Sequence, residues 1–218
     1  MKNSIVFNII CFSFLLLHGC KETVDVAIIG PDYFPLEEGK YIIYSVESIV
    51  HDAFKEQSDT SYYLEKETIQ EDLGNDSYKL LVERSTDSGR KWLFVKYLSI
   101  SKNTYTAQRN EDDIRKVKLS FPFKFRKTWD ANELNTLDQQ RARMLEFDTP
   151  HNFIDTTLTE TVTINLGDDE DPFFTFYERE VYARHIGLVE SKYKNLERQP
   201  EKYLSGTEHV KTFKETNW

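Results

Sequence analysis

Apolar and polar residues alternate along short segments of the chain, the pattern of β-strands with one face on a core. Tyr78, Leu80 and Val82 fall on one face of such a strand, while Lys79 and Glu83 fall on the other. Runs of this kind predict strands at residues 41–50, 62–69, 77–84, 92–100, 104–109, 114–121, 157–166, 173–182, 187–196 and 209–213. Because these strands do not alternate with helices, an antiparallel sheet is favoured over a parallel one.

Turn-forming residues separate the runs and allow successive strands to reverse direction. Residues 73–76 read Leu-Gly-Asn-Asp and residues 86–89 read Thr-Asp-Ser-Gly, which accept positive φ or bond their own backbone. Residues 35–39 predict the turn before the first strand, and the acidic stretch 167–172 predicts a later one. We therefore expect a mainly β fold: one domain, residues 32–218, built as a curved antiparallel meander sheet or partly open barrel.

Residues 130–144 allow two interpretations. Asp130 can cap a helix and Glu133 occupies the capping-box position, with apolar residues near helical spacing after it. Alternatively, residues 130–138 form a loop and residues 141–147 a strand, which keeps the meander unbroken. The sequence allows both a short helix and a loop followed by a strand.

The first twenty residues have the layout of an exported leader. Lys2 gives a positive start, and residues 5–17 form a mostly apolar stretch. A bilayer span needs ~20 apolar residues, so a cleaved leader is favoured over an uncleaved anchor. The stretch closes with Leu17-His18-Gly19-Cys20. This tetrapeptide resembles the lipobox at which bacterial lipoprotein precursors are acylated and cut.

The lipobox resemblance implies cleavage between Gly19 and Cys20 and acylation of the Cys20 thiol and amino group, with residues 1–19 as signal peptide and residues 20–31 as acylated cysteine and tether. Two or more acyl chains give stable membrane attachment, so the expected partner is a membrane reached through the lipid anchor. Lys21 follows the cysteine, where enteric bacteria use Asp to retain lipoproteins at the inner membrane. We therefore expect a cell-envelope location at the outer membrane. The sequence leaves two alternatives, the periplasmic face and the cell surface.

Composition supports this picture. Aromatic residues make up 14% of the chain, and such side chains favour pleated sheet. Cys11, the only cysteine besides Cys20, lies within the leader, so no disulfide is expected in the mature protein. The formal net charge of -9 argues against nucleic acid as a partner, because the phosphate backbone binds basic surfaces.

Two groups of residues resemble the opening and closing motifs of a group of bacterial envelope lipoproteins of unassigned function, found mostly in Bacteroidota. The opening comprises Tyr33-Phe34-Pro35-Leu36, Gly39, Tyr41, Tyr44 and Val46. The closing comprises Glu180-Val181-Tyr182-Ala183 and Ile186-Gly187-Leu188-Val189. His185 stands where that group usually has glycine. These motifs carry no nucleophile, base or ligand set, so the resemblance implies a location and a β-rich shape.

No pattern predicts a reaction, a metal or a cofactor. The four histidines outside the leader, His51, His151, His185 and His209, lack zinc-site spacing, and residues 168–171 lack the pattern of a calcium loop. No Gly-x-Ser-x-Gly elbow is present. We therefore expect a non-enzymatic protein without catalytic residues, metal ligands or cofactors.

Trp92 and Trp129 are the candidate ligand-binding residues, because aromatic rings can support a sugar or line an apolar cavity; the alternative is burial in the core. The leading hypothesis is a lipid-anchored binding or accessory domain with a protein, lipid or glycan partner. A carrier of an apolar or lipid ligand in the concave face of the sheet would need an apolar cavity of at least ~300 Å³. A glycan-binding protein would place Trp92 or Trp129 at the surface beside polar groups.

Overall fold

The computed structural model describes residues 30–198 and 203–218. The leader and the cleavage and lipidation site at Gly19 and Cys20 lie outside the described residues. Twelve strands are present in the described part: β1 (Tyr41–Asp52), β2 (Gln57–Gly74), β3 (Ser77–Ser85), β4 (Leu93–Lys102), β5 (Thr106–Glu111), β6 (Ile114–Ser120), β7 (Thr128–Asp130), β8 (Arg141–Asn152), β9 (Thr157–Glu170), β10 (Phe174–Ala183), β11 (Gly187–Glu197) and β12 (Ser205–Thr216). A single turn of 3-10 helix, η2 (Pro31–Tyr33), precedes them.

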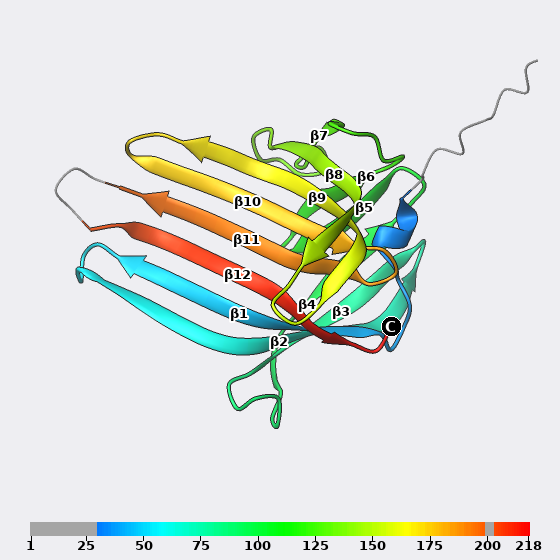
Figure 1. Ribbon diagram of the computed structural model, residues 1–218, viewed down its shortest axis with the longest axis horizontal. Helices are drawn as coiled ribbons and strands as arrows, with labels where there is room; N and C mark the ends of the chain where they lie inside the picture. Colours follow the sequence, from blue (N-terminus) through cyan, green and yellow to red (C-terminus); the bar gives the residue numbers. More distant parts are fainter. Residues whose placement is uncertain (1–29, 199–202) are drawn as a thin grey trace, which may run out of the picture.

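All twelve strands belong to one antiparallel sheet, in the order β6-β5-β4-β3-β2-β1-β12-β11-β10-β9-β8-β7 (Figure 1). The first and last strands pair at its middle, and the strands on either side follow as meanders. The two end strands approach each other, since the Val117 N–H donates to the Ala131 carbonyl at 2.9 Å and the Trp129 indole donates to the Val117 carbonyl at 3.0 Å. The sheet is therefore nearly closed into a barrel, and the expected mainly β architecture is confirmed.

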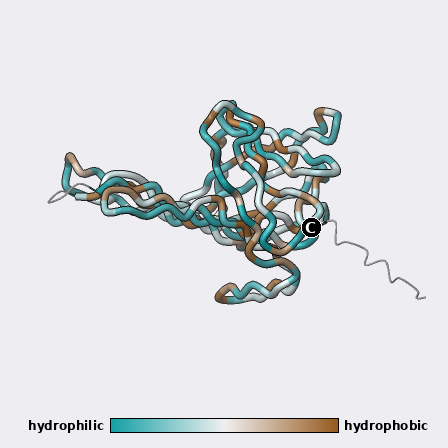
Figure 2. The backbone as a smooth tube through the Cα atoms, turned by 90° about the horizontal axis from the view of Figure 1, so that it is seen from above, coloured by the Kyte–Doolittle hydropathy of each residue, from teal (hydrophilic) through white to brown (hydrophobic). Residues whose placement is uncertain are grey.

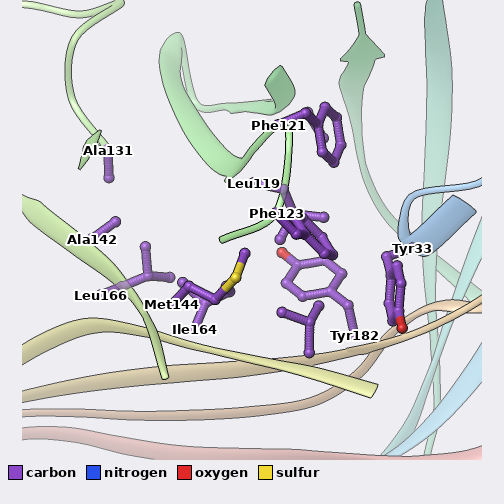
Figure 3. Close-up of a cluster of buried hydrophobic side chains, with 12 residues drawn as sticks. Tyr33, Leu119, Phe121, Phe123, Ala131, Ala142, Met144, Ile164, Leu166 and Tyr182 are labelled. Atoms are coloured by element: carbon purple, nitrogen blue, oxygen red, sulfur yellow. The ribbon is translucent and has the colours of Figure 1, made fainter. Parts of the chain in front are cut away.

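The main hydrophobic core lies inside the barrel (Figure 3). Its large buried side chains come from η2, β6, β8, β9 and β10 and include Tyr33, Leu119, Met144, Ile164 and Tyr182. Gly30 allows the chain to reach this core, because its φ is +85° and a Cβ there would lie 2.7 Å from the Phe123 ring. The segment before β1 is thereby fixed against the barrel.

Six strands extend beyond the barrel as a single layer. β3 flanks β2 only from the pair Leu64 and Ser85 onwards, and β8 flanks β9 only as far as the pair Asn165 and Arg143. The layer beyond these points, which we call the blade, comprises residues 47–52, 57–63, 165–170, 174–179, 192–197 and 205–210. It forms the left part of Figure 1 and the thin arm in Figure 2.

The blade has an inner face, continuous with the barrel interior, and an outer face. Along β10, Phe176 shares its side of the strand with Glu178 and Glu180, which point into the barrel. Cross-strand pairing carries the same face to Tyr193 of β11 and His209 of β12. These residues therefore lie on the inner face.

Residues 130–144 contain no helix, so the loop with a strand is confirmed and the helix is wrong. The Asp130 carboxylate accepts the backbone N–H groups of Asn132 at 2.9 Å and Gln140 at 3.0 Å, and so closes a loop between β7 and β8. In β8, buried Ala142 and Met144 alternate with exposed residues. This period of two matches a strand and excludes the helical spacing.

Several boundaries differ from the sequence prediction. The turn expected at residues 167–172 comes later, because β9 continues to Glu170. Gly167 instead lies within the strand, where a Cβ would stand 2.1 Å from the Phe176 ring; it serves close packing and not chain reversal. The short strand β7 was missed. His185 has a φ of 62°, the left-handed region that glycine favours.

Candidate functional site

Paired charges occupy the barrel interior where it meets the blade. Glu67 of β2 lies at the centre of one group. Its two oxygens accept hydrogen bonds from the Arg109 guanidinium at 2.9 and 3.0 Å, and one also accepts from Lys211 at 2.9 Å. Lys211 reaches Glu65 as well, at 2.5 Å. Because Arg109 is on β5 and Lys211 on β12, this group joins three separate strands.

A second group links β6, at one end of the sheet, to β10, nearer its other end. Lys118 of β6 donates to Glu180 at 2.7 Å and to Glu178 at 3.3 Å, both on β10. The Tyr182 hydroxyl donates to the other Glu180 oxygen at 2.6 Å, and the Gln140 amide donates to Glu178 at 2.9 Å. These contacts span the barrel and hold β6 against β10.

The interior charges balance within the described part of the chain. Four carboxylates (Glu65, Glu67, Glu178 and Glu180) face four cations (Arg109, Lys116, Lys118 and Lys211). The more exposed Glu111 pairs with Arg109 and Lys96. Burial raises the pKa of Glu67, but Arg109 and Lys211 outweigh it and hold the pKa well below its ordinary value. Burial lowers the pKa of Lys118, yet Glu180 and Glu178 raise it overall. The interior therefore contains mutually neutralised ions, which suit a structural role better than ligand capture.

The cavities of the described chain do not match a carrier. The two largest hollows, of about 460 and 890 Å³, are lined mostly by polar and charged residues. A cavity lined by apolar side chains including Ile42, Leu80 and Trp218 has a volume of about 60 Å³. A second, of about 260 Å³, is lined by charged groups of the interior, among them Arg109 and Lys118. Drug-sized or lipid ligands need about 300 Å³ or more of mostly apolar space. Neither of the cavities of about 60 and 260 Å³ offers that volume of apolar space.

A row of three rings crosses the inner face of the blade. The Phe176 and Tyr193 ring centroids are 6.1 Å apart with an interplanar angle of 81°, and those of Tyr193 and His209 are 6.1 Å apart at 59°. All three side chains are half-buried. Since they come from three adjacent strands, the sheet fixes their spacing, and no element of the described chain covers them.

The row is electrically neutral near pH 7. Burial and the nearby Lys211 lower the pKa of His209 below its ordinary value, so its imidazole is uncharged. Hydroxyl and amide side chains share this face on neighbouring strands: Ser48, Ser61, Asn195 and Thr207. The surface thus combines aromatic rings with hydroxyl and amide groups, and Asp169 of β9, directly opposite Phe176, adds one carboxylate. This composition suits binding, not proton transfer.

The structure does not bring Trp92 and Trp129 together. Trp129 packs against the main core and its indole donates to the Val117 carbonyl at 3.0 Å. Trp92 is half-buried at the end of the β3–β4 loop, with the Lys66 ammonium 5.9 Å from its ring centroid. The sequence did not single out Phe176, Tyr193 and His209, since only the pairing of β10, β11 and β12 makes them neighbours.

Two other histidines, His51 and His151, have structural partners. His51 lies 2.7 Å from the Ser58 hydroxyl and 3.0 Å from a Glu208 oxygen, and His151 lies 3.6 Å from Glu190. Over the described ranges, no three His, Cys, Asp or Glu side chains are grouped to hold a metal ion. Nor does that part of the chain contain a helix of the length and apolarity that a membrane crossing requires.

Comparison with known proteins gave no assignment: neither a scan against protein-family models nor a search of curated proteins produced a match for this chain.

Proposed function

We propose that this chain is a lipid-anchored, non-enzymatic binding domain of a bacterial envelope, and that the inner face of the blade is its binding surface. The observation that carries the proposal is the uncovered row of Phe176, Tyr193 and His209 beside a barrel already filled with paired charges. An interior occupied by paired charges directs binding to the outside, and half-exposed aromatic surface is typical of interaction sites.

The positions of the barrel and the blade at opposite ends of the molecule support exposure of the inner face to a partner. η2, which follows the proposed tether, lies at the barrel end of the molecule, and the turns of the blade lie at the opposite end (Figure 1). A chain anchored through Cys20 would therefore hold the barrel nearer the membrane and direct the blade away from it. The outer-membrane location remains part of the proposal.

A glycan is the second candidate ligand class, favoured by the composition of the inner face. Tyr193 has an apolar ring with a polar tip, and uncharged Ser, Thr and Asn side chains share its face. Sugars present apolar C–H faces ringed by hydroxyls, so rings and neutral hydrogen-bonding groups together match them. An apolar or lipid carrier lacks comparable support, because the interior is charged.

The anchor makes a direct prediction. Cells that express the wild-type chain and are fed radiolabelled palmitate are expected to label the protein, whereas Cys20→Ser is expected to remain unlabelled because it lacks the acylated thiol. Immunoprecipitation followed by autoradiography measures this. Label on both proteins, or on neither, would contradict the anchor.

The binding surface predicts a selective loss on mutation. Native mass spectrometry of protein purified from its own host's envelope should detect a bound glycan or protein. Tyr193→Ala is expected to lower its occupancy about tenfold, because a central aromatic contact is commonly worth more than about 1 kcal/mol. Tyr97→Ala is the matched control, since Tyr97 is a 50% exposed aromatic on the barrel wall. Equal occupancy in both variants would contradict a site on the inner face.

A further inference from the structure

The blade leaves one edge of β2 without a partner strand. β1 pairs with β2 from Asp52, opposite Gln57, to Tyr41, opposite Thr68, whereas β3 ends at Ser85, opposite Leu64. Residues 57–63 therefore form an exposed edge seven residues long. No other strand of the described chain continues this edge (Figure 1).

The register shows which backbone groups are free. The Ile69 N–H donates to the Lys40 carbonyl at 2.9 Å, so Ile69 directs its backbone toward β1. The β1–β2 register has no shift between this point and the turn, and backbone direction alternates along an antiparallel strand. The N–H and C=O groups of Ser58, Thr60 and Tyr62 consequently point away from β1, and no hydrogen bond within the described residues satisfies them.

This edge lacks the features that normally prevent strand addition. Residues 57–63 include no proline and no lysine, and Asp59 is their only charge. The opposite edge of the blade, on β9, is protected. The Gln140 amide donates to the carbonyl of Leu166, the bulged residue, at 2.9 Å, and Asp168, Asp169 and Glu170 end the strand. Of the two edges of the blade that the structure describes, the β2 edge is therefore the one open to pairing.

We propose that the β2 edge pairs with the same edge of a second copy of this chain, antiparallel about a two-fold axis at Thr60. This register places Thr60 opposite Thr60 and Ser58 opposite Tyr62, which satisfies every outward backbone group of the free segment. On the other face Asp59 meets Ser61, a hydroxyl that can donate to it. No two like charges are directly opposed.

The small charge of the pairing segment permits a second copy at this edge, and the acidic β9 edge limits the assembly to two. The chain carries a net charge of -9, yet the pairing segment contributes one charge per copy, so repulsion at the contact is small. Once two copies have paired through β2, the remaining edge of each blade is β9. The three acidic residues that end β9 repel the β9 edge of another dimer, and this prevents the open-ended addition that makes fibres. The inference is independent of what binds the inner face.

The contact is short, so a weak dimer is expected, of the class that buries less than about 1,200 Å² in total. The proposed anchor would compensate, because tethering raises the effective concentration of neighbouring copies. The test therefore uses the full-length chain in the envelope of its host and traps the contact covalently.

Thr60→Cys provides that trap, since directly opposed residues of a hydrogen-bonded antiparallel pair have Cα atoms about 5.5 Å apart, within disulfide range. Mild oxidation followed by non-reducing electrophoresis is expected to convert most of this variant into a disulfide-linked dimer. Asp168→Cys on the protected β9 edge is the matched control, and the wild type measures background from Cys11 and Cys20. A dimer yield no higher than that of the control overturns the proposal.

A second substitution tests strand pairing itself. Adding Tyr62→Pro to Thr60→Cys removes one outward N–H and leaves the β1 ladder intact, so dimer yield is expected to fall about tenfold. Adding Tyr62→Val keeps the N–H and is expected to preserve the yield. If Tyr62→Pro lowers the amount of folded protein, Ser58→Pro repeats the test. Persistence of the dimer with either proline overturns the pairing, and a disulfide from the introduced cysteine to a different protein overturns the second copy as occupant.

Discussion

Replacement of Lys118 by methionine is expected to lower the free energy of unfolding by about 3–5 kcal/mol, the range for breaking a buried ion pair by removing one partner. The Lys118 side chain is 9% exposed and lies 2.7 Å from Glu180 and 3.3 Å from Glu178. Without the ammonium, two carboxylates remain buried and like-charged. Urea denaturation of the purified variants measures the change.

Lys194→Met is the control for this substitution. Lys194 also forms an ion pair, at 2.5 Å from Glu208, but its side chain is 49% exposed, so its loss should change stability by less than about 1 kcal/mol. Adding Glu180→Gln to Lys118→Met should restore part of the loss, because it removes one of the two uncompensated charges. Equal effects of the two lysine substitutions would contradict a structural role for the interior charges.

Stability is expected to fall as the pH drops below about 5. Arg109 lowers the pKa of Glu111 to about 2 despite burial, and the pKa of Glu67 also lies well below its ordinary value. A carboxylate with a lowered folded-state pKa stabilises the fold above its unfolded-state pKa and loses that contribution as the pH falls through the folded-state value. The paired cation Lys118 has a raised pKa, so its contribution is lost only above about pH 10.

The variant Glu67→Gln isolates one site in this acid transition. Unfolding of the wild type between about pH 3 and 4 should take up about one proton more than unfolding of the variant. The free energy of unfolding of the wild type should therefore decline more steeply with falling pH than that of the variant, by about 1.4 kcal/mol per pH unit. Denaturation curves at several pH values measure both slopes. Parallel slopes would show that Glu67 is not held ionised by Arg109 and Lys211.

The strands could be predicted because a half-buried strand leaves a period of two in its sequence. Tyr78, Leu80 and Val82 show it, and β3 lies where that pattern places it. Ser205 to Glu208 show no such pattern, so the start of β12 was missed. These residues belong to the blade, where both faces of the sheet lack a covering layer and burial therefore imposes little period.

The candidate site could not be predicted, because its neighbours are set by strand register. Lys118 and Glu180 are 62 residues apart in sequence. Glu65 and Glu67 alternate along β2 much as Lys79 and Glu83 do along β3, yet both Glu65 and Glu67 are buried in the barrel. Charged residues usually mark the solvated face of a strand, and only the closure of the barrel reverses that rule.

Site-specific photo-cross-linking tests most directly whether binding occurs on the inner face of the blade. Benzoylphenylalanine would replace Tyr193 in the full-length chain within its host's envelope, and Tyr97 on the barrel wall in a matched control. We predict an ultraviolet-dependent adduct of defined mass from position 193 and none from position 97. An adduct from position 97 alone, or no adduct from position 193, would contradict binding at the ring row.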